Sequence, residues 1–480
     1  MSSESPQSPR SPQSPRVRVR DAFARRLLGT IVVLAVIAGG FAFASVVQGP
    51  RLSAAKIDAQ RSTRLAGQQL VIEVNQPVAS FDADEISVEP EASVSAVADD
   101  RLITVTFDEP LDYASEYTVR VPGVVGAFQG VPATLEYTFE TPDEQVYSLV
   151  RRSLDGEPDL IQRKSFTEPG GEIVFTAPRI QEFAHAGDVL AAVTIDDAGA
   201  NELFVAGVEQ DEPQEIALPM DAVVRDLEAS TTNPLIGYLV STPPVDGARA
   251  QDSALYIADL TGAAGGPPKP VAGLDGEPIK VASWSFVPGT TAVVVQDFEQ
   301  SVFLVDAFGS APVTPLGVHS EVRGFVPGTS RLVVADPDRG SMIDLTDGTT
   351  TTVDLPVPSL GDSDYPGRLT MTGDDRYVLS VVMVVVQPDG STSIASRLAQ
   401  VDATSTTDVF TPASEGSIIR EYCISPNGRY AAVTTSDAQG RPDGYPGLPG
   451  YTESTMSVVD LSSGAVEFSQ SGGFSDWCSS

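Results

Sequence analysis

The sequence predicts an all-β protein, with a β-sandwich followed by a β-propeller and one transmembrane helix in front of them. Three patterns support this prediction. An uncharged run of 21 residues occupies positions 27–47. Apolar and polar residues then alternate with period two, which is typical of half-buried strands. From residue 143 a unit of short strands recurs at intervals of roughly 40–50 residues, the spacing of propeller blades.

The composition excludes several classes of function. The chain has 480 residues with 30 Lys and Arg against 65 Asp and Glu, a formal net charge of −35. A nucleic-acid binder must offer cations to phosphates, so this charge argues against that class. Two Cys and two His are too few for a disulfide framework or a zinc cluster.

Motifs for catalysis and for cofactors are missing from the sequence. It holds no G-x-S-x-G elbow and no glycine-rich phosphate loop before a helix. His185 and His319 lie within the repeats and are expected to be turn or core residues rather than general bases. We therefore predict no catalytic residue and no cofactor, with calcium as the one ion left to consider.

Residues 27–47, LLGTIVVLAVIAGGFAFASVV, are long enough as a helix to cross about 30 Å of hydrocarbon. Arg25 and Arg26 directly precede this run, so the positive-inside rule places residues 1–26 in the cytoplasm. The alternative is a cleaved signal peptide with an A-x-A pattern at 42–44. A long basic segment before the run and the length of the run itself favour an uncleaved anchor. The tail repeats SPQSPR, which predicts a disordered segment that sets the topology.

Residues 52–142 contain four alternating runs, QLVIEV, RLITVTF, EYTVRV and LEYTFE. With turn residues between them and no helical period, these runs predict a two-sheet sandwich. The order of VIEVNQPV, ITVTFDEPLDYASEYTVRVPGV and YTFETP resembles SbsA-type bacterial Ig-like domains. This resemblance implies an Ig-like β-sandwich that serves as a spacer or adhesion module of a surface protein.

The repeats occupy residues 143–480. FVPGT occurs at 286 and again at 325, and SPNGRY at 425 opens another clear copy. Six units can be counted from His185 onward. A seventh would combine VYSLVRRS and DLIQRKS with the C-terminal GGFSDWC, so that both chain ends share one blade and close the ring. The repeats predict seven blades, with six as the alternative.

Several repeat elements, FVPGT, SPNGRY and VVDLSSG, resemble the TolB-like and WD-repeat-like propellers of bacterial envelopes. The resemblance implies a platform that binds proteins, peptides or glycans, and the fold alone does not fix the ligand.

Acidic residues in the loops are the candidates for a metal site or for catalysis. Asp336 and Asp338 lie in DPDRGSMID, and Asp362 and Asp364 lie in GDSDYPG. Carboxylates bind calcium, and a pair of them can serve a lyase or glycosidase. Because β-hairpins also prefer Asp at turns, solvated turns are the favoured interpretation.

The loop at 437–455, DAQGRPDGYPGLPGYTEST, is long for a hairpin and carries Tyr445, Leu448 and Tyr451 among Gly and Pro. Two interpretations stay open. Exposed aromatic residues on an insertion are typical of a binding rim. Alternatively, the loop caps the channel of the propeller.

Cys423 and Cys478 are the two cysteines of the chain. An even pair outside the membrane favours a disulfide, and two buried free thiols are the alternative.

Together these features predict a single-pass protein of the bacterial cytoplasmic membrane, with its N-terminus inside and its β-domains outside. The expected function is non-catalytic binding or scaffolding, with an envelope protein or a cell-wall glycan as partner. A propeller lyase or glycosidase is the competing class, and a clustered acidic pair beside aromatic residues at one channel mouth would favour it. A sensor that signals to the basic tail is the third hypothesis. The sequence leaves the oligomeric state open.

Overall fold

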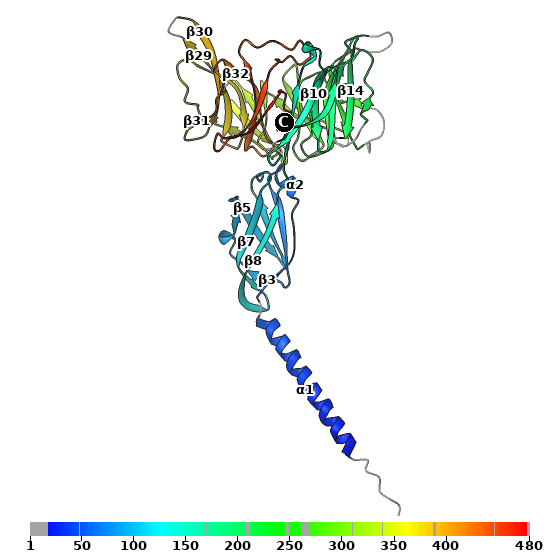
Figure 1. Ribbon diagram of the computed structural model, residues 1–480, viewed down its shortest axis with the longest axis vertical. Helices are drawn as coiled ribbons and strands as arrows, with labels where there is room; N and C mark the ends of the chain where they lie inside the picture. Colours follow the sequence, from blue (N-terminus) through cyan, green and yellow to red (C-terminus); the bar gives the residue numbers. More distant parts are fainter. Residues whose placement is uncertain are drawn as a thin grey trace, which may run out of the picture.

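Figure 1 shows the computed structural model, in which a long helix, a narrow β-sandwich and a broad propeller-like body follow one another along the chain. The structure describes residues 18–47, 49–168, 170–207, 212–244, 250–261, 268–309, 311–337, 339–386, 390–445 and 447–477. Apart from the first helix and three short helical turns, its regular elements are β-strands. The turns are α2 (Ala59–Ser62), η1 (Ala83–Glu85) and η2 (Ser153–Asp155).

The first element is helix α1 (Arg18–Val47), which leads into the sandwich. It covers the predicted apolar run and begins before it, so residues 18–26 are helical rather than disordered as the sequence predicted. Ala and Arg in this stretch are strong helix formers, and they extend the helix toward the N-terminus. Residues 1–17, with the SPQSPR repeats, lie outside the described residues.

Within the described part of the chain, no helix combines the length and the hydropathy required to cross a membrane.

Two four-stranded sheets face each other in the sandwich. One has the order β1 (Leu52–Lys56), β2 (Gln68–Val74), β6 (Leu102–Phe107) and β5 (Val94–Asp99). In the other, β7 (Glu116–Gly126) pairs with β3 (Val78–Ser80), β4 (Ser87–Glu89) and β8 (Gln129–Glu140). Alternate apolar residues of both sheets form one buried core, which includes Leu70, Ile72, Ile103, Val105, Tyr117, Val119 and Leu135. These are positions that the period-two alternation predicts to be buried.

Seven antiparallel sheets follow in the described residues from Gln145 onward. The first sheet has three strands, β9 (Gln145–Val150), β10 (Asp159–Ser165) and β11 (Glu172–Ala177). The other six have four strands each, paired in chain order, and together the seven sheets form the broad propeller-like body seen from the side in Figure 1.

The strands of the second, third and fourth sheets are β12 (Ile180–Ala186), β13 (Val189–Ile195), β14 (Asn201–Gly207), β15 (Gln214–Ile216); β16 (Val223–Ala229), β17 (Leu235–Thr242), β18 (Gln251–Asp259), β19 (Lys269–Pro270); and β20 (Val281–Phe286), β21 (Ala292–Asp297), β22 (Ser301–Asp306), β23 (Thr314–Val318). Those of the fifth, sixth and seventh sheets are β24 (Glu321–Phe325), β25 (Arg331–Asp336), β26 (Arg339–Asp344), β27 (Thr350–Val353); β28 (Asp364–Met371), β29 (Tyr377–Val386), β30 (Thr392–Val401), β31 (Thr406–Phe410); and β32 (Ser417–Ile424), β33 (Tyr430–Asp437), β34 (Thr455–Asp460), β35 (Val466–Ser471).

The C-terminal residues 473–477 join the first sheet to its neighbours. Leu149 of β9 and Gly473 exchange two backbone hydrogen bonds, of 2.9 and 3.0 Å, in an antiparallel bridge. The next amide, that of Phe474, donates to Glu421 of β32 at 2.6 Å. Two residues further on, Asp476 accepts a hydrogen bond from His185 of β12. The end of the chain therefore takes the innermost place of the three-stranded first sheet and contacts the sheets on both sides.

The sandwich contacts one face of the propeller, which we call the proximal face. The contact residues lie in turns between the first and second strands of the propeller sheets. Ala66 donates its amide to the Gly328 carbonyl at 2.9 Å, and the Asn427 side chain donates to the Leu111 carbonyl at 3.2 Å. Arg429 pairs with Asp112 at 2.9 Å. The inner strands begin at the opposite face, the distal face, where the hairpin of β29 and β30 also projects (Figure 1).

Tyr113 anchors the sandwich in an aromatic cluster at the proximal face. Its side chain is buried and packs on Phe166, Tyr430 and Trp477, with ring centroids 5.7, 5.9 and 6.0 Å away. These rings come from the loop after β10, from the seventh sheet and from residues 473–477, which we call the closing segment. One residue of the sandwich therefore contacts both ends of the propeller chain.

Replacing Tyr113 by Ala should lower the free energy of unfolding by about 3–5 kcal/mol, because it leaves a cavity where three segments meet. Tyr113→Phe is the matched control. The buried Tyr113 hydroxyl has no hydrogen-bond partner in the described structure, so its removal should leave stability almost unchanged. Urea unfolding of the full-length chain in detergent measures both. Equal losses in the two variants would contradict a packing role for the ring.

Candidate functional site

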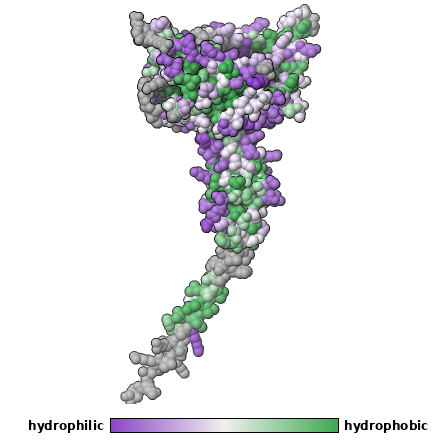
Figure 2. Space-filling model, turned by 180° about the vertical axis from the view of Figure 1, so that it is seen from behind, coloured by the Kyte–Doolittle hydropathy of each residue, from purple (hydrophilic) through white to green (hydrophobic). Residues whose placement is uncertain are grey.

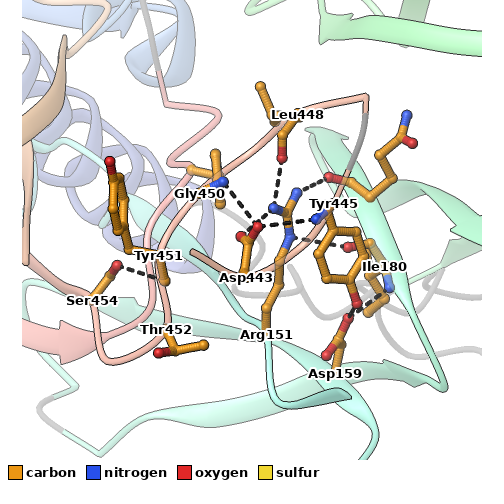
Figure 3. A network of polar contacts seen from close by, with 12 residues as sticks. Arg151, Asp159, Ile180, Asp443, Tyr445, Leu448, Gly450, Tyr451, Thr452 and Ser454 are labelled. Atoms are coloured by element: carbon orange, nitrogen blue, oxygen red, sulfur yellow. Dashed lines mark hydrogen bonds and ion pairs between the residues drawn. The ribbon is translucent and has the colours of Figure 1, made fainter. Parts of the chain in front are cut away.

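The loop at 437–455 is bound down on the propeller by a buried arginine (Figure 3). Arg151 follows β9, and its guanidinium lies 2.6 Å from the Asp443 carboxylate of the loop, with both side chains almost fully buried. It also donates to the Leu448 carbonyl at 2.6 Å and to the Ile180 and Gln181 carbonyls of β12. An arginine presents five N–H donors in one plane, which suits several acceptors from different segments.

Aromatic rings on both sides enclose the same guanidinium. Its carbon lies 4.1 Å from the Tyr445 ring centroid and 4.3 Å from that of Phe474. Desolvated cation–π contacts of this kind add to the ion pair. Arg151 therefore joins the first sheet, the second sheet, the long loop and the C-terminal segment at one point.

The predicted rim residues are consequently not an exposed aromatic patch. Tyr445 is buried, and its hydroxyl bonds Asp159 and Ser153 of the first sheet. Tyr451 is half-buried beneath Arg420, whose guanidinium carbon lies 3.6 Å from the ring centroid. Of the three residues, Leu448 lines a large cavity, and Tyr451 lines only a small one of about 60 Å³. The structure favours the second interpretation, a loop that covers part of the channel, because buried polar partners hold it in place.

A β-bulge interrupts the inner strand of each four-stranded propeller sheet. The register with the second strand shifts after Ile180, Arg225, Val281, Val322, Pro366 and Ile419. A bulge inserts an extra residue and redirects side chains, and bulges are frequent beside functional sites. Here the shifts occur near the start of each inner strand, so a ring of redirected residues surrounds the distal mouth of the channel.

The ring encloses a cavity of about 630 Å³. Its walls come from the inner strands, and Leu448 and Phe474 contribute from the long loop and the closing segment. Charged groups on the walls include Glu182, Arg225, Asp226, Glu228, Glu321, Arg323, Arg368, Glu421 and Asp476. A volume of this size falls in the range of small-ligand sites. We call it the distal cavity.

The carboxyl groups of the distal cavity have perturbed acidities. Burial raises the pKa of Glu182 to about 7, although Leu227 donates its amide to this carboxylate at 2.8 Å. Burial also raises the pKa of Glu421, against the hydrogen bond from the Phe474 amide. Surrounding protein raises the pKa of Asp226 as well, although Arg225 beside it acts in the other direction. Raised pKa values in a cavity mark candidate functional groups.

Asp226 has a second unusual property. Its side chain is accessible from the cavity, and its backbone is left-handed, with φ of 59°. Asp tolerates this conformation better than most residues, yet it remains uncommon and is often found where function requires it.

The four acids predicted as calcium ligands do not form a cluster. Asp336 accepts from His319 and from the Ser320 amide, at 3.2 and 3.1 Å. Asp364 pairs with Arg397 at 2.7 Å, and Asp362 lies exposed in a turn. Asp338 is outside the described residues. No group of three or more metal-ligating side chains gathers in the described ranges, so the calcium site stays a prediction without structural support.

Cys423 and His185 are the remaining sequence candidates that the structure describes. Cys423 lies in β32 with a buried free thiol, 3.9 Å from the Ser475 carbonyl. Cys478 is not among the described residues, so the disulfide stays a prediction. His185 is part-buried against Tyr147 and bonds Asp476 at 2.6 Å. Burial lowers its pKa, but the charge of Asp476 outweighs this effect and raises the pKa overall. This is a structural ion pair across the closing segment.

Comparison with known proteins identifies no family. No family model and no curated protein matches the chain. Solved structures do match, among them a putative TolB from Agrobacterium tumefaciens (12% identity, 69% of this chain and 91% of that one, TM-score 0.31) and TolB from Acinetobacter baumannii (10%, 75% and 78%, 0.34). A third is a putative 6-phosphogluconolactonase from Bacteroides fragilis (12%, 69% and 94%, 0.39). Similarity this distant says nothing about ligand or activity.

Arg151→Met should lower the free energy of unfolding by about 3–5 kcal/mol, because it leaves Asp443 buried without a counter-charge. The neighbouring Arg152→Met is the control, since Arg152 pairs with the largely exposed Glu157 and a surface pair contributes about 1 kcal/mol or less. Chemical denaturation of the two variants gives the comparison. Similar losses in both would show that the loop does not depend on the buried pair.

Glu182 should make stability depend on pH. Its pKa rises from 4.5 to about 7 on folding. The contribution of Glu182 to the free energy of unfolding is therefore fully present below pH 4.5 and is lost as the pH rises through about 7. The loss amounts to about 3 kcal/mol. Glu182→Gln should abolish this component, and denaturation at pH 4.5, 5.5, 6.5 and 7.5 measures it against wild type. Parallel pH profiles of the two proteins would contradict the assignment.

Proposed function

We propose that the protein is a membrane-anchored, extracytoplasmic binding protein without catalytic activity. In this proposal α1 is the anchor, the sandwich is an Ig-like spacer, and the seven propeller sheets carry the binding surface on their distal face. Its partner is an envelope protein or a cell-wall glycan. The net charge of −35 argues against nucleic acid.

The observation that carries the proposal is the difference between the two faces of the propeller. The sandwich docks on part of the proximal face, through the Arg429–Asp112 pair and the Tyr113 cluster, and a cleft of about 820 Å³ lies between it and the propeller turns. The distal face holds the cavity, the loop at 437–455 and the extended β29–β30 hairpin. Insertions on one face of a propeller are typical of its binding side.

The distal hairpin also exposes apolar surface. Val384, Val385, Val386 and Ile394 on β29 and β30 are exposed. Figure 2 shows hydrophobic groups among mainly hydrophilic residues over the propeller. Exposed apolar patches rimmed by polar residues are a feature of interaction sites.

The anchor rests on the charge pattern before α1 and on the surface of the helix. Arg25 and Arg26 precede large exposed apolar side chains from Leu27 to Ile37. The described part of α1 is largely hydrophobic in Figure 2. With this helix in the membrane, the sandwich would hold the distal face away from the lipid.

Site-specific photo-crosslinking in cells tests the binding face. A photoreactive residue at Val386, 69% exposed on the distal hairpin, should give discrete adducts with an envelope protein or glycan. The matched control is Val97, 67% exposed on the sandwich, which should give few adducts. Mass spectrometry identifies the products. The same bystander proteins from both positions would overturn the proposal.

One observation favours the enzyme alternative. Glu182, with a pKa of about 7, and Asp226 lie with the aromatic Trp284 at the distal mouth, the arrangement predicted for a lyase or glycosidase. Against it, both oxygens of Glu182 already accept hydrogen bonds, from Leu227 and Gln181. Cleavage of purified cell-wall glycan by wild type and not by Glu182→Gln would establish the enzyme instead.

A further inference from the structure

Most charged side chains of the distal cavity already have partners. Glu182 accepts from the Leu227 amide, and Glu421 accepts from the Phe474 amide. Arg323 pairs with Glu321 at 3.2 Å, and Arg225 donates to Ser253. Asp476 holds His185, and Glu228 is engaged as well. These contacts stabilise the walls, and the partly satisfied carboxylates of Glu228 and Asp476 each keep one buried oxygen without a hydrogen bond in the described structure.

Two exposed groups of opposite charge form none of these contacts, Asp226 and Arg368. Within the described residues, the Arg368 guanidinium forms no ion pair and no hydrogen bond, and its one aromatic neighbour is Tyr422 at 5.7 Å. The Asp226 carboxylate has Arg225 beside it and receives no hydrogen bond of good geometry from the described chain. Both side chains are exposed and line the cavity.

The two groups lie on opposite walls. Asp226 belongs to β16 of the third sheet and Arg368 to β28 of the sixth. In a ring of seven sheets, a separation of three is as far apart as two sheets can be. Both residues occupy the bulge of their inner strand, so they lie at similar depth. An anion and a cation that each lack an ion-pair partner therefore lie on opposite walls of the mouth, with Arg225 beside Asp226 and Glu421 near Arg368.

Neutral donors on the fourth sheet lie between these walls. Trp284 and Ser285 of β20 are buried and line the cavity, and neither the indole N–H nor the Ser285 hydroxyl has a hydrogen-bond partner in the described structure. The indole N–H lies near Asp226 without reaching hydrogen-bond geometry. Buried polar groups without partners are costly, and a ligand that supplies the missing partners recovers that cost.

Gly237 fixes the orientation of this tryptophan. A Cβ at Gly237 would lie 2.2 Å from Cη2 of Trp284, so the six-membered ring occupies the space of a missing side chain on β17. The indole is therefore held by packing before any ligand arrives. Preorganised donors of this kind raise affinity because little ordering is required on binding.

We propose that the distal cavity binds a zwitterionic ligand of the class of short peptides with free termini. Asp226 receives the terminal ammonium group, Arg368 receives the carboxylate, and the Trp284 N–H donates to a carbonyl between them. The inference rests on the proposed binding function and names the ligand class of the same distal face.

The charge arrangement selects against other ligand classes. An uncharged sugar supplies an ion-pair partner to neither Asp226 nor Arg368. A simple anion would pair with Arg368 but would be repelled by the carboxylates on the opposite wall. A simple cation would pair with Asp226 but would be repelled by Arg368. A ligand with one charge of each sign at its ends satisfies both walls, and repulsion excludes the wrong orientation.

Calorimetric titration of the full-length chain with di-, tri- and tetra-alanine tests the proposal. An extended peptide adds about 3.3–3.6 Å per residue, so one length should bind best. For that length, N-acetylation or C-terminal amidation should each weaken binding about tenfold or more, the effect of losing one charge-assisted hydrogen bond.

Variants assign each terminus to its wall. In Asp226→Asn, acetylation of the peptide should no longer weaken binding, while amidation still should; Arg368→Gln should show the reverse. Asn tolerates the left-handed backbone, so the Asp226 variant preserves the local fold. Arg323→Gln, whose partner is Glu321, is the matched control and should change affinity less than about threefold.

Two results would overturn the inference. One is equal binding of free, acetylated and amidated peptides, which would show that the end charges are not recognised. The other is no heat of binding for any peptide at millimolar concentration. If Val386 still gives discrete crosslinks in that case, the binding function stands and the peptide assignment alone falls. If neither experiment gives a signal, both fall.

Discussion

The propeller depends on one constraint, the insertion of residues 473–477 between its first and last sheets. Without these residues the three-stranded first sheet would present an open edge, and an open edge is a site of aggregation. The Leu149–Gly473 bridge pairs that edge, and the following residues contact Glu421, His185 and Tyr113 from three directions. Because Phe474 also packs on Arg151, the same segment holds the long loop in place. Closure of the ring, docking of the sandwich and coverage of the distal mouth are thus linked.

The linkage explains why the two ends of the channel differ. At the proximal end, apolar and aromatic side chains around Tyr113 and Trp477 form the cluster on which the sandwich docks, beside a cleft of about 820 Å³ between the two domains. At the distal end, bulges redirect charged residues into the mouth, where burial raises the pKa of Glu182 and Glu421. The rigid proximal half supports a polar cavity that would be unfavourable without partners.

Much of the architecture could be predicted from the sequence, because alternation and repetition report directly on burial. The strands of the sandwich and the contribution of GGFSDWC to the first sheet follow from such patterns. The site could not be predicted in the same way. Tyr445 lies in a Gly- and Pro-rich loop, which indicates exposure, but its burial depends on Arg151, almost three hundred positions away. Asp226 and Arg368 lie within strands, and only the bulges and the ring closure bring them to one mouth. Several charged residues inside an inner strand, as in VVRDLEA, were the one available signal.

Hydrogen exchange at the C-terminus tests the central claim, that the closing segment is an integral part of the ring. The amides of Gly473 and Phe474 donate to Leu149 and Glu421. Their hydrogens should therefore exchange only through global unfolding, at the slow rate of the amides of β9 and β32. Exchange of these two amides at the rate of a frayed chain end, while β9 and β32 stay protected, would contradict the account.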